Sequence, residues 1–305
     1  MKESEKTQVE QDNPVNKLVD GFKDIQRLKT DIFRQRVDYD EGIKNALAEA
    51  RQQGVDAVCQ LEQQLDPIEH AEPAVVIDLL LSYRAVRAWN DMIRLVSKMS
   101  APLAETVMVQ EQLGLALNRA GRGEEAEQVL LSLIAKHGPS SETNSILGRV
   151  YKDRWAAARA AGEHALAQES LNKAIAAYLQ GFESDWRDAY PGINAVSLME
   201  LAEPPDPRRM DLLPVVRYAV ERRMAVGTPD YWDHATLLEL AVLAKNEARA
   251  RDNLSDALAS VREAWEPEST ARNLHFIHDV RKARGEALAW AVEIENSLIL
   301  GSKAQ

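Results

Sequence analysis

A regular spacing separates three similar blocks in the first half of the chain. The segments Leu80–Tyr83, Gly114–Leu117 and Gly148–Tyr151 begin about 34 residues apart, which is the period of tetratricopeptide repeats. A second apolar segment follows each block. Because one helix pair cannot bury its apolar face alone, such pairs stack against one another. The spacing therefore predicts an all-α fold: a tetratricopeptide-like helical-repeat solenoid, in which antiparallel helix pairs form a right-handed superhelix.

The composition agrees with a globular helical protein. Of the 305 residues, 45% are hydrophobic and 28% are charged, and no segment shows the alternation of a half-buried strand. The single cysteine, Cys59, excludes a disulfide within the chain and is typical of a reducing compartment. We therefore expect a cytoplasmic protein, and no motif calls for a cofactor.

Charge and hydropathy limit the possible partners. A net charge of −11 at pH 7 argues against general binding to nucleic acid, which requires a dense Lys and Arg surface. The most apolar run, Val75–Tyr83, contains Asp78 and is too short to span a bilayer. Residues 1–13 are polar and of mixed charge, so we expect a disordered tail there and no secretion signal. These features predict no membrane and no nucleic-acid partner, and they leave the oligomeric state open.

Helical periodicity divides the rest of the chain into two parts. Residues 14–72 are expected to form leading helices, with Gly54 as a break between two of them. Residues 73–301 are expected to form the tetratricopeptide-like domain with its C-terminal capping helices. In the second repeat, Gly114 and Ala126 are small enough to let the paired helices approach closely.

The later repeats depart from the regular period. The second half of the third repeat arrives late, which predicts lengthened helices around a turn at Gly162. A Pro-rich loop and a helix at 208–226 are expected in the fourth repeat. The fifth repeat begins at Tyr231, and we expect it to end at Pro267. Residues 269–300 are then expected to form one or two helices that cap the stack.

Particular residues within the repeats carry a family resemblance. They occur in order as Leu79–Arg84, Ala116–Arg119, Gly148–Asp153, Gly181–Glu183 with Gly192–Asn194, and Tyr231–Asp233. The Tyr-Lys-Asp and Gly-Ile-Asn runs among them are not generic repeat residues. From about Val75 to Ile277, the chain closely resembles the TRAF-binding regulatory region of the apoptosis signal-regulating kinases.

The resemblance implies a regulatory and scaffolding domain, which in these kinases lies between a sensor region and the kinase. The chain contains no Gly-rich phosphate loop, no His-Arg-Asp and no Asp-Phe-Gly motif, so kinase activity is not implied. A free-standing domain of this kind resembles the prokaryotic branch of the family, which implies a role in signalling or defence. The predicted function is a non-enzymatic scaffold or adaptor that regulates a separately encoded effector through its concave groove.

The repeat register also predicts which side chains line that groove. In a tetratricopeptide repeat the first helix lines the concave face, and the corresponding positions here are Arg84, Asn118, Arg119, Arg149 and Lys152. Asn194 is a further candidate for the same groove. Most of these are cations on a chain whose net charge is negative. Because Arg and Lys bind carboxylates and phosphates, we expect the groove to hold a protein partner by an acidic segment, a C-terminal carboxylate or a phosphorylated peptide.

Alternatives to this groove remain open. The cations could instead pair with nearby carboxylates such as Glu111, Glu142 and Asp153 on a solvated face. A second functional possibility is a sensor that binds a nucleotide or another phosphorylated small ligand in the same basic groove. Asn194 is expected at the start of a helix, where it could help to bind an anion or act as a cap.

Other candidate sites have simpler structural explanations. Asp233 and His234 could suggest an acid–base pair, but capping by Asp233 explains that segment, and we predict no catalytic residue. His275 and His278 offer two metal ligands without a third, so no metal site is expected. The arginines of the helix at 208–226 could dock an anionic partner surface or pair with acids on a solvated face.

Overall fold

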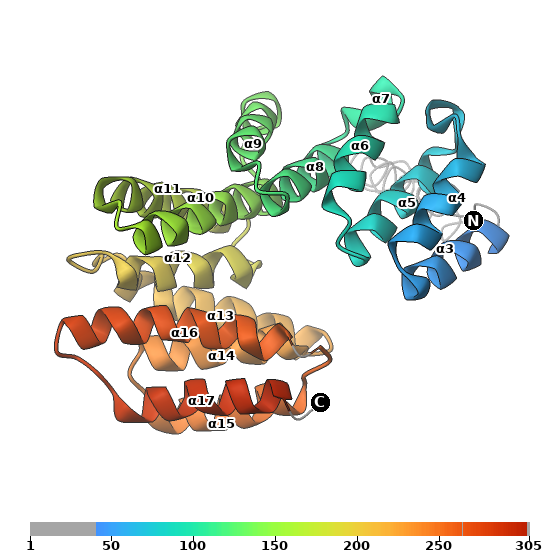
Figure 1. Ribbon diagram of the computed structural model, residues 1–305. Helices are drawn as coiled ribbons and strands as arrows, with labels where there is room; N and C mark the ends of the chain where they lie inside the picture. The colour runs from blue at the N-terminus through green and yellow to red at the C-terminus, as the bar shows by residue number, and fades with distance from the viewer. Residues whose placement is uncertain (1–40, 264, 304–305) are drawn as a thin grey trace, which may run out of the picture. The chain divides into compact units, whose positions relative to one another are not determined.

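The computed structural model describes residues 41–263 and 265–303, and every regular element within these ranges is a helix (Figure 1). The all-helical fold predicted from the repeat spacing is therefore confirmed. The tail predicted at 1–13 and the leading helix predicted to begin at Pro14 lie outside the described residues. The chain divides into two compact units, residues 1–109 and 110–305.

The first unit contains leading helices and the first repeat. Its elements are α3 (Glu41–Gln53), α4 (Val55–Leu65), the 3-10 turn η1 (Ile68–His70), α5 (Pro73–Ala85), α6 (Trp89–Lys98) and α7 (Ala101–Ala104). Helix α5 packs on α3, α4 and α6. The break predicted at Gly54 is confirmed, since its φ of 108° is a conformation that favours glycine. The domain boundaries expected from the sequence stay predictions.

Apolar side chains from these helices form the core of the first unit. The fully buried ones are Leu47, Val58, Val76, Leu79, Leu80, Tyr83, Met92 and Leu95. Most of them come from α5 and α6, the two helices of the first repeat. Pro73 occupies the start of α5, where a missing backbone N–H leaves no helical hydrogen bond unmade.

The second unit is a series of helix pairs. Helix α8 (Val107–Arg119) begins in the first unit and continues into the second. It is followed by α9 (Gly123–His137), α10 (Ser141–Ala161), α11 (His164–Ser184), α12 (Ala189–Leu201), α13 (Arg209–Val226), α14 (Tyr231–Leu243), α15 (Glu247–Ala259), α16 (Trp265–Ala283) and α17 (Ala289–Lys303). From α10 onward, each first helix packs on the helix that follows it: α10 on α11, α12 on α13, α14 on α15 and α16 on α17.

Glycines let the two helices of a pair approach closely in α8 with α9 and in α10 with α11, as expected for Gly114. A Cβ atom at Gly114 would lie 2.8 Å from the Leu130 side chain of α9. At Gly148 it would lie 2.7 Å from the ring of Tyr178 on α11. Ala126 is also fully buried. The small residues of the repeat pattern therefore set the distance between the helices of a pair.

The departures from the regular period predicted for the third and fourth repeats are confirmed. Helices α10 and α11 are 21 residues each, and Gly162 ends α10 with a φ of 73°. Helix α13 begins at Arg209 after the Pro-rich loop. The expected end of the fifth repeat at Pro267 is wrong, because α16 already begins at Trp265. Proline is tolerated in the first turn of a helix, where the N–H groups have no helical partner.

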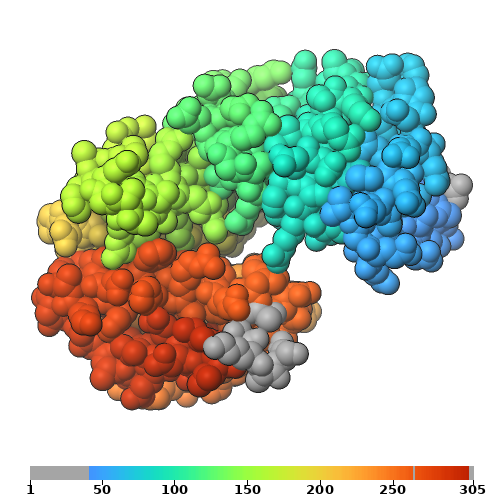
Figure 2. Space-filling view, in the orientation of Figure 1, coloured from blue at the N-terminus to red at the C-terminus, as the bar shows by residue number. Residues whose placement is uncertain are grey.

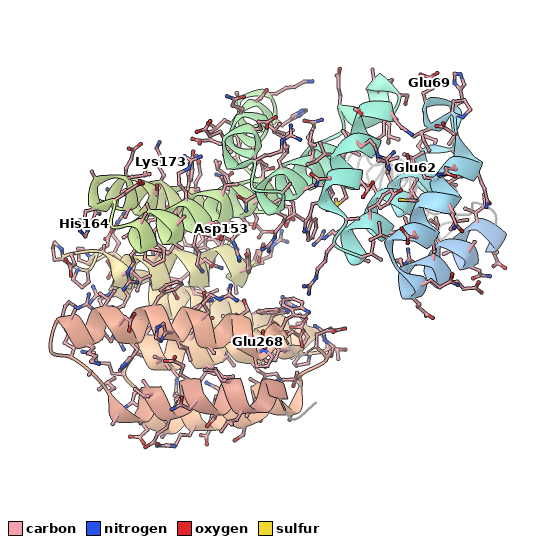
Figure 3. The ribbon with its side chains drawn as sticks, in the orientation of Figure 1. Glu62, Glu69, Asp153, His164, Lys173 and Glu268 are labelled. Atoms are coloured by element: carbon pink, nitrogen blue, oxygen red, sulfur yellow. The ribbon has the colours of Figure 1, made fainter. Side chains whose placement is uncertain are left out.

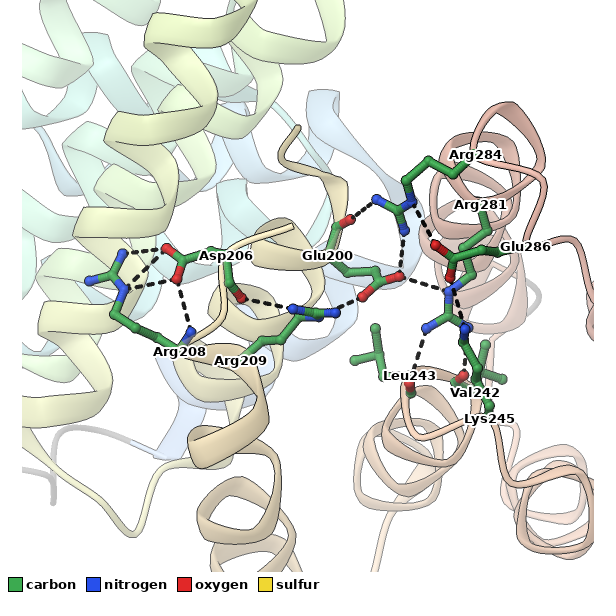
Figure 4. Close-up of polar contacts among 10 residues, drawn as sticks. All are labelled: Glu200, Asp206, Arg208, Arg209, Val242, Leu243, Lys245, Arg281, Arg284 and Glu286. Atoms are coloured by element: carbon green, nitrogen blue, oxygen red, sulfur yellow. Dashed lines mark hydrogen bonds and ion pairs between the residues drawn. The ribbon is translucent and has the colours of Figure 1, made fainter. Parts of the chain in front are cut away.

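A buried carboxylate joins helices that are distant in sequence (Figure 4). Glu200 of α12 accepts hydrogen bonds from Arg209 Nε of α13 and from Arg281 Nε of α16, both at 2.8 Å. Arg281 also donates to the backbone oxygens of Val242 and Leu243 at the end of α14. Burial alone would raise the pKa of Glu200, but Arg281 and Arg209 lower it below its usual value. These bonds fix α16 against α12 and α14.

Candidate functional site

The side chains predicted to line a groove in the second unit lie on the first helices α8, α10 and α12. They are Asn118, Arg119, Arg149, Lys152 and Asn194, and we call them the basic face. Hydrogen bonds join these residues to Asp153 and to α16, and the charges of the two arginines act on Tyr190. The sixth predicted residue, Arg84, is exposed on α5 in the first unit, so its place in a common groove stays a prediction.

Asp153, labelled on α10 in Figure 3, connects the first two helices of the basic face. Its carboxylate accepts a hydrogen bond from Asn118 Nδ2 of α8 and another from Arg149 Nε, each at 2.8 Å. The alternative to the groove, in which a cation pairs with Asp153, is thus observed for Arg149. Since both Arg149 and Asp153 are partly exposed, the ion pair orients the guanidinium more than it stabilises the fold.

Lys152 is held inside a polar cluster that spans four helices. Its ammonium donates to the Oδ1 atoms of Asn194 on α12 and Asn273 on α16, both at 3.0 Å. Asn273 in turn donates to Glu239 of α14 at 3.1 Å. Burial and the neighbouring charge of Arg149 lower the pKa of Lys152 to about 8, although Glu239 acts in the opposite direction. Burial likewise raises the pKa of Glu239.

Helix α16 therefore lies against the first helices of three earlier repeats. Besides the bond to Lys152, Phe276 packs edge-on against Trp155 of α10 with ring centroids 5.0 Å apart, and Asp279 lies 3.6 Å from Arg159. In the space-filling view, α16 and α17, orange to red, cover the near side of the C-terminal half of this unit (Figure 2). The sequence predicted a simple cap here, but α16 also engages Lys152, which was predicted to be a groove residue.

Tyr190 adds an exposed aromatic side chain to the basic face, and the buried Tyr178 packs beneath it. Tyr190 of α12 is 47% exposed, and its ring meets that of Tyr178 edge-on with centroids 6.3 Å apart. Loss of water around its hydroxyl raises the pKa of Tyr190, while the positive charges of Arg149 and Arg119 act in the opposite direction. The hydroxyl of Tyr178 is buried and has no hydrogen-bond partner among the described residues.

The predicted position of Asn194 at a helix start is wrong. Helix α12 begins at Ala189, and Asp188 is its N-cap, accepting from the backbone N–H of Tyr190 at 3.1 Å. Asn194 lies one turn inside the helix, is buried, and donates to the backbone oxygen of Tyr190. It can neither cap the helix nor expose free N–H groups to an anion. Its observed role is to accept the hydrogen bond from Lys152.

A surface cavity of about 510 Å³ lies elsewhere in the second unit. Its lining includes Asn172 and Leu179 of α11 together with Pro204 and Arg208 near the start of α13. None of the residues of the basic face lines it. The basic face is therefore a surface defined by its charges and aromatic rings, distinct from this cavity.

Among the remaining candidate residues, Asp233 and His275 have structural partners. Asp230 and Asp233 form a capping box at the start of α14, as expected for Asp233. His275 lies 2.9 Å from Glu295 of α17. Across residues 41–263 and 265–303, no group of three or more His, Cys, Asp or Glu side chains is arranged to hold a metal ion. Within the same ranges, no helix is both long and apolar enough to cross a membrane.

Comparison with known proteins identifies longer relatives. The chain is 27% identical over 263 residues to mitogen-activated protein kinase kinase kinase nsy-1 of Caenorhabditis elegans, covering 77% of this chain and 17% of that protein. It is 26% identical over 285 residues to mitogen-activated protein kinase kinase kinase 15 of Mus musculus, covering 87% of this chain and 21% of that protein. The chain thus spans only a minor part of the length of these relatives.

A solved structure and a family profile also match. A thermophilic TPR protein of Thermus thermophilus aligns with a TM-score of 0.49 and 13% identity, covering 66% of this chain and 98% of that protein. The family profile described as the MAP3K TRAFs-binding domain matches residues 1–294. Because this match covers most of the sequence, the chain belongs to the MAP3K TRAFs-binding domain family.

Proposed function

We propose that this chain is a non-enzymatic scaffold that holds a partner protein on its basic face and thereby regulates an associated signalling or defence effector. The family, described by its binding of TRAFs, supports a protein as the class of partner. The observation that carries the proposal is that the positive charges of Arg149 and Arg119 both act on the hydroxyl of Tyr190, whose side chain is 47% exposed. Arginine and tyrosine are the residue types that most often anchor protein interfaces.

The chemistry of the basic face favours an anionic group on the partner. Asp153 holds the Arg149 guanidinium through Nε, so its terminal N–H groups keep a defined direction. Tyr190, whose side chain is 47% exposed, adds a hydroxyl donor to the same face. Arginine forks and hydroxyl donors match the oxygens of carboxylates and phosphates. The proposed ligand is therefore an acidic or phosphorylated peptide segment, or a C-terminal carboxylate.

The test is peptide binding by the intact chain and by a double variant, Arg149→Ala with Tyr190→Ala. Fluorescence polarisation with acidic, phosphorylated and neutral peptides should show micromolar binding of one anionic class, which corresponds to about −8 kcal/mol. The double variant should lose about 2 kcal/mol or more of that binding energy, because both side chains are interface anchors. Lys152 is left unchanged, since its ammonium is already bonded within the polar cluster.

The matched control is Arg249→Ala on α15, an exposed arginine outside the basic face. It should bind the peptides like the wild-type chain, and circular dichroism should show that both variants remain helical. Equal binding by the double variant and the wild type would contradict the proposal. Failure of every peptide, together with a concentration-dependent rise in melting temperature with nucleotides, would favour the sensor alternative instead.

A further inference from the structure

Helix α13 carries exposed apolar side chains that the basic face does not use. Met210, Tyr218 and Val226 are 62%, 69% and 70% exposed. On the inner side of the same helix, Val216 and Val220 are buried, and α13 packs there on α12 and α14. Large exposed apolar side chains gathered on one helix are typical of surfaces that bind another protein.

Four side chains of this helix form a regular stripe. They follow one another at intervals of four, three and four residues: Asp211, Val215, Tyr218 and Arg222. Side chains with these intervals lie on one side of an α-helix. An acid therefore stands at one end of the stripe and a base at the other, and between them lie the partly buried Val215 and the exposed Tyr218. We call these four residues the α13 stripe.

The charges at the two ends of the stripe are not engaged within the chain. Asp211 and Arg222 are both exposed, and in the described part of the chain their side chains form no hydrogen bond or ion pair. By contrast, Arg209 and Arg223 of the same helix pair with carboxylates of α12 and α14. Pairing with acids, one of the two alternatives given for the arginines of this helix, applies to Arg209 and Arg223. The other alternative, docking of a partner, remains open to Arg222.

The α13 stripe is complementary to itself. When two copies of α13 lie antiparallel about a two-fold axis between Val215 and Tyr218, Asp211 of each copy meets Arg222 of the other. Val215 of each copy then meets Tyr218 of the other, so every contact forms twice. From this symmetry we infer that the α13 stripe is an interface between two copies of this chain.

A second copy of the chain pairs both charges of the α13 stripe, whereas an acidic partner surface pairs only Arg222. An acidic surface would neutralise Arg222 but would place a like charge against Asp211, which is unfavourable. Two chains that each carry a net charge of −11 repel one another, so opposite charges are needed at the point of approach. One helix pair is a small interface, and the dimer is therefore weak and depends on concentration.

Substitutions that reverse the charge at either end of the stripe test the inference. Analytical ultracentrifugation of the wild-type chain over micromolar to millimolar concentrations should show a reversible monomer–dimer equilibrium. Asp211→Arg alone and Arg222→Asp alone should each weaken dimerisation at least tenfold, because each creates two like-charge contacts. An equimolar mixture of the two variants should recover the dimer, since every charge contact between the two different chains then joins opposite signs.

The matched controls are Arg249→Asp and Asp252→Arg, exposed charges on α15 that lie outside the stripe. These variants should dimerise like the wild-type chain. Tyr218→Ala should weaken the dimer without changing its charge. A wild-type chain that stays monomeric at all concentrations overturns the inference, as does a mixture of the two charge variants that fails to recover the dimer.

Discussion

The carboxylate of Glu62, labelled in Figure 3, lies in the core of the first unit and is only 3% exposed. Arg94 bonds both of its oxygens, at 2.6 and 2.8 Å, and Lys98 donates to it at 2.9 Å. The Tyr83 hydroxyl donates a further bond. Burial opposes the charge, but these donors together lower the pKa of Glu62 to about 2. A single residue of α4 thus connects α5 and α6.

Replacing Glu62 with Gln should lower the free energy of unfolding by about 3 kcal/mol at neutral pH, because the charged carboxylate is stabilised more in the folded chain than in the unfolded chain. The folded pKa is about 2 and the reference value is 4.5. The stabilisation by charged Glu62 is therefore fully present above pH 4.5 and is lost as the pH falls towards 2. Urea unfolding of both chains over this pH range measures the difference.

The control for Glu62 is Glu69→Gln, which alters an exposed carboxylate of η1. It should change stability by less than about 1 kcal/mol, since surface ion pairs contribute little. A difference between wild type and Glu62→Gln that does not change with pH would show that packing, and not the charge, makes Glu62 important.

At the scale of the elements, glycine decides how closely two helices pack. Alanine normally favours a helix over glycine by about 1 kcal/mol. At Gly148, however, the added Cβ would lie 2.7 Å from the Tyr178 ring, which is itself fully buried. The ring cannot move outward without disturbing the contact between α10 and α11. Packing therefore outweighs helix propensity at this position.

Gly148→Ala should destabilise the chain by about 2 kcal/mol, the usual cost of overfilling a packed core. Gly123→Ala at the start of α9 is the control, because the nearest atom to its added Cβ would be 3.9 Å away. It should be neutral or should stabilise the chain slightly. Urea unfolding midpoints of the two variants test the comparison, and equal stability of both would show that α10 and α11 can separate freely.

At the scale of the whole molecule, internal contacts group residues 1–109 and residues 110–305 into separate compact units. Each unit has its own buried apolar core and its own buried, multiply bonded carboxylate, Glu62 in the first and Glu200 in the second. Compact units with their own cores open separately when local stability is reduced.

Hydrogen exchange measured by mass spectrometry should detect this separation. Glu62→Gln should speed exchange in α3 to α6 and leave α10 to α17 unchanged. Gly148→Ala should do the reverse, because contacts within a unit carry most of the coupling. Faster exchange throughout the chain in both variants would show instead that the two units open as one.

Much of the fold could be predicted because its signals are local. The apolar periodicity located the helices, and Gly54 and Gly162 marked turns that require positive φ. The errors at Asn194 and Pro267 both concern helices with proline in the first turn, where proline is accepted and the helix begins before it. Within the site, the pairing of Arg149 with Asp153 was foreseeable, since residues four apart are neighbours on a helix.

The amino-acid sequence by itself determined the helix pairs, their lengths and the cations on the first helices, because period, caps and turns depend on neighbours in the chain. The tertiary structure alone decided which of those cations are engaged. Lys152 bonds Asn273, which lies 121 positions away, and the charge of Arg149 on α10 acts on the hydroxyl of Tyr190 on α12. Such contacts follow from how helices pack around a shared core. No pattern within a short stretch of sequence shows which distant residues come together.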